Sequence, residues 1–304
     1  MSIPALNDTM AYLQYLTKLA DQNRKGTDTS WVSSNTYLVF LMQAGFCFLE
    51  AGAVRHKNHV SALIKNTLDM TLTTICWWLI GYGFAFGKSA GGVIGTSFFA
   101  GDGVESFDQY NNWMFQWAFA GTSATIVSGS VLERITIWGF IYFSSWVTLW
   151  IYPLVVHWCW SDNGWLKALG FLDFAGSGVV HMVGGVAGLC FTLFINPRIG
   201  RFSESQKIRD YFKPYYVSFI ALGTFILWFC WYGFNCGSTI QIVGDDVTKL
   251  IGRIGTNTSI SASICGFTCF LFHYFLNKGT NDEFRPCDDL QRNFSWSCFN
   301  YCWL

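Results

Sequence analysis

ITIWGFIYFSSWVTLWIYPLVVHWCW, residues 135–160, contains no Asp, Glu, Lys or Arg from one end to the other. A helix that crosses the hydrocarbon core of a bilayer needs about 20 mainly apolar residues, because lipid offers no partner for unpaired backbone groups. This stretch is long enough and apolar enough to do so. The sequence therefore predicts a membrane-spanning helix here.

The composition of the whole chain agrees with a membrane protein. Charged residues are 12% of the sequence, about half of the ~25% usual in soluble domains, and hydrophobic residues are 52%. Mean hydropathy is +0.31. Lys and Arg total 19 and so do Asp and Glu, so no basic surface points to a nucleic-acid partner.

The same reasoning predicts an all-α, polytopic bundle of transmembrane helices. The expected spans are at about 31–53, 60–86, 111–132, 135–158, 176–195, 215–237 and 256–277. We expect residues 1–29 to form an extracellular N-terminal segment, since they lack the central apolar stretch of a signal peptide. Residues 278–304 read as an aberrant polar tail.

The distribution of basic residues predicts the orientation. Loops after the first, third and fifth spans carry most of the Lys and Arg, among them Arg55, Arg134 and Arg198. Because positive residues stay on the cytoplasmic side, these loops should be cytoplasmic and the N-terminus should be outside.

Two charged residues lie one helical turn apart within the second span. Lys65 and Asp69 are spaced so that they can neutralise each other. We interpret them as a structural clamp. Glu50 lies near the end of the first span.

The fifth span combines a carboxylate with an imidazole. Asp173 opens it, where a side-chain oxygen can accept hydrogen bonds from the first free backbone amides, and a capping role is at least as reasonable as cation binding. His181 follows eight residues later, roughly 12 Å along a helix. A buried imidazole can take a proton from a bound cation or pass one on. Its alternative is a core histidine bonded to a neighbouring helix.

Four aromatic residues form a candidate cation path: Phe115, Phe119, Trp160 and Phe234. A ring face attracts a desolvated cation by about 0.5–2 kcal/mol, and stacked rings can close a narrow pore to water. By composition alone, ordinary packing is the simpler explanation of each, because Phe and Trp are abundant in this chain. Residue type alone does not choose between the two.

Enzymatic chemistry and cofactor binding have no support in the sequence. No activated nucleophile or phosphate-binding loop is evident, and the cysteines lack the close pairing of a zinc site. We therefore expect neither a catalytic residue nor a metal or other cofactor.

Five blocks, in this order, resemble the ammonium transporter family, in its Amt branch. They cover about residues 30–277 and are MQAGF (42–46) with LEAG (49–52), RHKN (55–58), QWAF (116–119) running to GSVLER (129–134), DFAGSGVVH (173–181) and WYGFNCGS (231–238).

The resemblance implies a transporter fold, a homotrimer and one pore in each protomer. By position, an external ammonium recruitment site would comprise Phe115, Trp160 and Ser238, with Asp173 supporting it without touching the ion. Phe119 and Phe234 would be a stacked gate below. His181 would be the first of two pore histidines. The ligand would be ammonium or ammonia, in a multi-pass protein of the plasma membrane.

The chain departs from the family pattern after its seventh span. Family members have about eleven spans related by an inverted repeat, and the second histidine belongs to the tenth. The later His273 cannot replace it. We interpret this as a frameshifted or misannotated gene, or as a truncated form able to join or inhibit trimers with full-length homologues. The chain alone should conduct ammonium poorly or not at all.

Two alternatives from other classes remain at this point. Seven helices with an external N-terminus also describe a seven-helix receptor, although the seventh span has no mid-helix Lys for a retinal Schiff base. An ammonium sensor would share every motif of a carrier, and signalling without flux would distinguish it.

Overall fold

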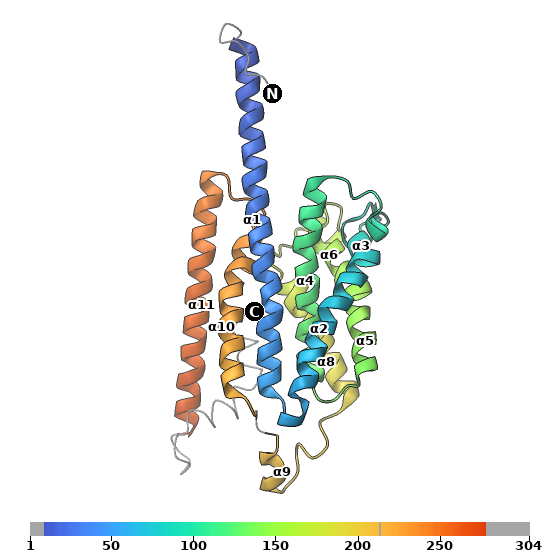
Figure 1. Cartoon of the computed structure of the whole chain (residues 1–304), viewed down its shortest axis with the longest axis vertical. Coiled ribbons are helices and arrows are strands. Elements are labelled where there is room, and N and C mark those ends of the chain that lie inside the picture. Colours follow the sequence, from blue (N-terminus) through green and yellow to red (C-terminus); the bar gives the residue numbers. More distant parts are fainter. Residues whose placement is uncertain (1–8, 213, 278–304) are drawn as a thin grey trace.

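The computed structural model describes residues 9–212 and 214–277, which form a bundle of long helices (Figure 1). The helices of the first half are α1 (Thr9–Ala53), α2 (His59–Cys76), α3 (Tyr82–Phe86), α4 (Phe107–Val131), α5 (Ile137–Trp146) and α6 (Tyr152–Trp160). The second half contributes α7 (Trp165–Ala168), α8 (Val183–Ile195), α9 (Gln206–Asp210), α10 (Val217–Gly237) and α11 (Asp245–Asn277). The all-α prediction is confirmed, apart from a two-residue hairpin of β1 (Ser89–Ala90) and β2 (Ile94–Gly95).

Three membrane-length helices contain a wider π-helical turn. It joins α2 to α3 at Trp77–Gly81, joins α5 to α6 at Val147–Ile151, and precedes α8 at Ser177–Met182. Short 3-10 turns lie at His56–Asn58 and Phe99–Gly101. Single π-helical turns are frequent at functional sites, and the third of these carries His181.

All seven predicted spans are helical, but their bounds and polarity differ from the prediction. Four helical segments are long and apolar enough to cross a membrane: Thr9–Ala53, Ile137–Ala168, Ser177–Ile195 and Val217–Gly237. The helices over 60–86, 111–132 and 256–277 do not meet the same requirement of length and apolar composition. The second of the predicted spans carries Lys65, Asn66 and Asp69, buried against other helices.

The first helix begins far earlier than the predicted span. It starts at Thr9, and its polar first half projects beyond the rest of the bundle (Figure 1). Residues 9–30 contain no proline and many good helix formers, so nothing ends the helix before the apolar part. Residues 1–8 and the predicted polar tail, 278–304, lie outside the described residues.

The core lies where α1 packs against α2, α4 and α10. Among its fully buried side chains are Val39, Met42, Trp77, Phe119 and Val127. Large apolar side chains on the outside of the bundle, such as Trp138, Tyr142, Leu193, Phe194 and Phe267, are exposed. That surface suits lipid, because the bilayer core offers apolar side chains a favourable environment.

Helices α1 and α10 touch through their backbones at two glycines. A Cβ atom added to Gly223 would lie 2.6 Å from the carbonyl oxygen of Gly45 and 2.6 Å from the amide nitrogen of Leu49. Small residues let membrane helices approach this closely. The contact sets the position of α10, which carries Phe234.

We expect Gly223→Ala to lower the free energy of unfolding by about 1–3 kcal/mol, since the added methyl group forces α10 away from α1. Thermal unfolding of the purified protein measures this. Gly252→Ala is the control, because nothing lies within 4 Å of its added Cβ on helix α11. It should be neutral or stabilising by about 0.5–1 kcal/mol. Equal effects of the two substitutions would contradict the close-contact explanation.

The loops after α1, α4 and α8 meet at Glu133, whose side chain is 0% exposed. Its carboxylate accepts hydrogen bonds from Arg55 Nε at 2.9 Å, from Asn58 Nδ2 at 2.6 Å and from Arg198. Burial alone would raise the pKa of Glu133, but these donors together outweigh it and hold the pKa below its ordinary value. The three loops therefore share one end of the bundle. That this end is cytoplasmic stays a prediction.

The predicted pairing of Lys65 with Asp69 is wrong. The Asp69 carboxylate accepts hydrogen bonds from Thr125 Oγ1 at 2.8 Å and from Ser144 Oγ, while Lys65 Nζ lies 5.6 Å from the centre of the Phe140 ring. Helical spacing places the two charges on one face of α2, but hydroxyl groups from α4 and α5 reach the carboxylate there.

Candidate functional site

Two phenyl rings stack at the centre of the candidate site. Phe119 of α4 and Phe234 of α10 have ring centroids 4.2 Å apart and an interplanar angle of 24°. Each side chain is 1% exposed, so the pair is enclosed by protein. The sequence named these two residues as a gate, and the structure brings them into contact.

Further aromatic rings continue from this pair along α4 and α6. The centroid of Phe115 lies 4.6 Å from that of Phe119, and Trp160 meets Phe119 edge-on at 6.1 Å. Ser238, at the end of α10, donates its hydroxyl proton to the carbonyl of Phe234 at 2.8 Å. The lone pairs of that hydroxyl oxygen remain able to accept a hydrogen bond.

Asp173 organises the segment that faces Trp160. Its Oδ1 accepts from the amide of Gly176 at 2.6 Å, and its Oδ2 accepts from Gly178 at 2.9 Å and Val179 at 2.7 Å. This is the capping arrangement expected for a carboxylate at the start of a helix. The carbonyl oxygen of Asp173 also accepts from Trp160 Nε1 at 2.8 Å, which fixes the indole ring.

The imidazole of His181 lies on the other side of Phe234. Its ring is 5.3 Å from Phe234, and its backbone amide donates to Gly176 five residues earlier at 3.0 Å, within the π-helical turn. The side chain is 6% exposed, and within the part of the chain that the structure describes its Nε2 has no hydrogen-bond partner. A buried nitrogen of this kind is available to a ligand or a proton.

Trp231 belongs to the site but is missing from the predicted set. Its ring stacks on His181, with centroids 5.7 Å apart and an interplanar angle of 17°. The spacing Trp231 to Phe234 places both on one face of α10, which was the available signal. Helical spacing cannot show, however, that the π-helical turn before α8 brings the imidazole of His181 to that face.

Taken together, the arrangement is a series of contacting rings that ends at an imidazole. The order of contacts is Trp160, Phe119, Phe234 and His181, with Phe115 beside Phe119. Ring faces suit a weakly hydrated cation, and the imidazole can accept a proton. Within residues 9–212 and 214–277, no group of three or more His, Cys, Asp or Glu side chains could hold a metal ion.

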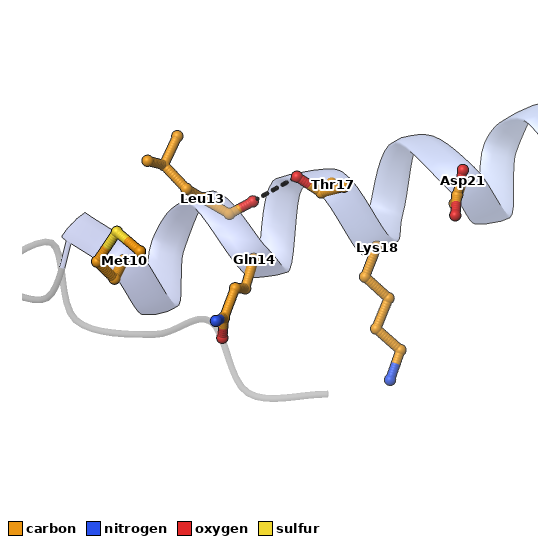
Figure 2. A pocket seen from close by; sticks show the side chains of 6 residues that line it. All are labelled: Met10, Leu13, Gln14, Thr17, Lys18 and Asp21. Atoms are coloured by element: carbon orange, nitrogen blue, oxygen red, sulfur yellow. Dashed lines mark hydrogen bonds between the residues drawn. The ribbon is translucent and has the colours of Figure 1, made fainter.

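A separate surface hollow lies away from these rings, on the projecting N-terminal part of α1. Figure 2 shows its lining residues, Met10, Leu13, Gln14, Thr17, Lys18 and Asp21, on a single helix. The hydroxyl of Thr17 donates to the Leu13 carbonyl at 2.9 Å, which is an ordinary contact within a helix. Nothing there resembles the buried ring series.

Comparison with known proteins gives consistent matches. The profile of the Ammonium Transporter Family matches residues 30–282. Ammonium transporter 3 of Dictyostelium discoideum is 38% identical, over 84% of this chain and 60% of its own length. A putative ammonium transporter of Synechocystis is 43% identical, over 78% of this chain and 54% of its own.

Solved structures give the same result for the fold. A structure described as a Sensor Amt Protein has a TM-score of 0.78 and 34% identity, covering 85% of this chain and 64% of that one. Candida albicans Mep2 has a TM-score of 0.74 and 28% identity, covering 91% of this chain and 58% of that one. The chain thus spans less than two thirds of the length of these relatives.

Proposed function

Because this chain belongs to the ammonium transporter family, we propose that it recruits ammonium at Trp160, Phe115 and Ser238 and passes it through a gate formed by Phe119 and Phe234. His181 then accepts the proton that the cation gives up. The observation that carries this proposal is the continuous contact of rings from Trp160 to the imidazole of His181, whose Nε2 has no hydrogen-bond partner among the described residues.

Selectivity in this scheme comes from hydrogen bonding rather than size. Ammonium and potassium have similar radii, but ammonium donates hydrogen bonds in four directions. The hydroxyl oxygen of Ser238 can accept one, while Trp160 and Phe115 offer ring faces. Beyond the gate, neutral ammonia avoids the high cost of a bare charge among apolar side chains.

Asp173 has a supporting role in the proposal. Its carboxylate is occupied by three backbone amides, so it acts on the ion through the field and through the position of Trp160. Asp173 therefore supports the recruitment site without touching the ion.

We extend the proposal to assembly and location. The chain would form a homotrimer, or a mixed trimer with full-length homologues, in the plasma membrane with its N-terminus outside. The preponderance of Lys and Arg in the loops gathered around Glu133 supports that orientation.

Ammonium binding by the purified chain tests the recruitment site. Thermal unfolding in ammonium chloride should show stabilisation that the same concentration of potassium chloride does not produce. We expect Trp160→Leu to weaken binding by about 2- to 30-fold, which corresponds to a loss of roughly 0.5–2 kcal/mol of cation–π attraction.

Trp158→Leu is the matched control, because Trp158 lies on the same helix but its ring contacts Trp165 at an interplanar angle of 55° and its Nε1 donates to the carbonyl of Val93. It should leave ammonium binding unchanged. Equal stabilisation by both salts, or equal losses in the two variants, would overturn the recruitment site.

A sensor is the second candidate, supported by the likeness to the Sensor Amt Protein. A sensor and a carrier would share ammonium binding, so binding cannot separate them. Uptake of a labelled ammonium analogue by cells that lack other carriers would favour the carrier. A signalling response without uptake would favour the sensor.

A further inference from the structure

A second set of buried ionisable groups lies away from the rings. Glu50 on α1 and Asp69 on α2 are each 0% exposed. Within the described residues, no nitrogen of Lys or Arg comes within 4.0 Å of either carboxyl group. A buried carboxylate without a neighbouring cation is costly, so the ionisation state of these two groups needs an explanation.

The hydroxyl of Thr125, next to Asp69, has more acceptor oxygens around it than hydrogens to donate. Thr125 Oγ1 lies 2.8 Å from Asp69 Oδ2, 2.7 Å from Gln43 Oε1 and 2.9 Å from the carbonyl oxygen of Gly121. A hydroxyl group has one hydrogen and cannot donate to three acceptors. A proton on Asp69 Oδ2 eases the conflict: Asp69 then donates to Thr125, and the one hydrogen of Thr125 is left with two acceptors, the oxygens of Gln43 and Gly121, in place of three.

The hydrogen-bond partners of Glu50 are neutral side chains. Its Oε1 accepts from Ser128 Oγ at 2.8 Å, and its Oε2 accepts from Asn66 Nδ2 at 2.7 Å. The Oδ1 of the same Asn66 amide is buried and has no partner among the described residues. Because Asn66 Nδ2 also donates to the carbonyl oxygen of Ala62 at 3.0 Å, the amide keeps its donor toward Glu50, which therefore has two neutral donors and no cation beside it.

The charges around the two carboxyl groups are few. Lys65, Asp69 and the thiol of Cys47 are the groups that interact electrostatically with Glu50, and Glu133 acts on Lys65 from the end of the bundle. From α4 and α5 the groups that reach the carboxyls are the hydroxyls of Thr125, Ser128 and Ser144. With both carboxyls ionised, Glu50 and Asp69 would repel each other inside the bundle, and Lys65 acts on Glu50 but not on Asp69.

We propose that Glu50 and Asp69 form a proton-binding site inside the membrane, separate from the ring series, which holds at least one proton at neutral pH. The hydroxyls of α4 that reach the two carboxyls lie on other faces of the helix than Phe119, Thr125 about 120° away and Ser128 about 180° away around a helix of 3.6 residues per turn. The proposal therefore does not depend on the function of the rings.

Infrared spectroscopy of the 304-residue chain in lipid nanodiscs tests this directly. A protonated carboxyl group has a carbonyl stretch distinct from that of a carboxylate. We expect this band at neutral pH in the unaltered protein, and we expect carbon-13 labelling of aspartate to shift it. Because labelling alters no side chain, this measurement stands even if a variant fails to fold.

Substitution then assigns the band. Asp69→Asn should remove half of it or more, and the double change with Glu50→Gln should abolish it. Glu133→Gln is the control: that carboxyl is equally buried but bound by two arginines, so it contributes no protonated band. Absence of the band in the unaltered protein would refute the site and would mean that the Gln43 amide is reversed and donates to Thr125. Survival of the band in the double variant would refute it also.

Discussion

Asp173→Ala should remove measurable ammonium binding, with an effect larger than that of any single ring substitution. The carboxylate accepts three backbone amide hydrogen bonds, and bonds to a charged group contribute roughly 1.5–3 kcal/mol each. Without the carboxylate, the turn at Gly176 loses its anchor. The backbone carbonyl of residue 173 remains, but it is no longer held where it accepts from the indole of Trp160. We expect a loss of more than about 30-fold in affinity, equivalent to roughly 2 kcal/mol.

The measurement is the ammonium-dependent shift in thermal unfolding used for the ring variants. Asp162→Ala is a matched control, since Asp162 is 96% exposed in the neighbouring loop and pairs with Lys167 at 2.9 Å. It should bind ammonium as the unaltered protein does. Normal affinity in Asp173→Ala would show that the carboxylate has no part in the site.

Glu133→Gln should destabilise the fold by about 3 kcal/mol. Removing one member of a buried ion pair costs roughly 3–5 kcal/mol, and we take the lower end because Arg55 and Arg198 keep 16% and 25% of their side chains exposed. Both guanidinium groups would lose the same charged acceptor. Thermal or denaturant unfolding of the purified chain measures the effect, and Glu105→Gln in an exposed loop serves as the control.

The pH dependence of this ion-pair cluster has a defined sign. Because the pKa of Glu133 is lowered in the folded state, its contribution is complete above the pKa of an ordinary glutamate, about 4.3. It is lost as the pH falls through the lower folded value. The unaltered protein should therefore lose stability in acid more steeply than Glu133→Gln does. Parallel acid profiles would show that the carboxylate is not what holds the loops.

Much of the architecture could be predicted because each feature depends on residues close together in sequence. Long apolar runs predicted the helices, and the position of Asp173 before the fifth span predicted its bonds to the first amides. The resemblance placed Phe119 and Phe234 in one gate, and the structure has them stacked. Their role in transport remains a prediction.

What could not be predicted depends on contacts between distant elements. Asp69 binds Thr125 and Ser144, which are 56 and 75 residues away, so the local pairing with Lys65 was the wrong expectation. Trp231 stacks on His181 only because α10 lies against the turn before α8. The start of α1 was also missed, because polar sequence alone does not separate an exposed helix from a loop.

The unbroken run of α1 from Thr9 into the bundle has a mechanical consequence. A helix rises about 1.5 Å per residue, so the part before Trp31 is a stiff rod roughly 33 Å long. A flexible segment of equal length would let its far end approach the end of the bundle. The continuous helix instead holds anything attached at Thr9 at a fixed distance from the helical bundle.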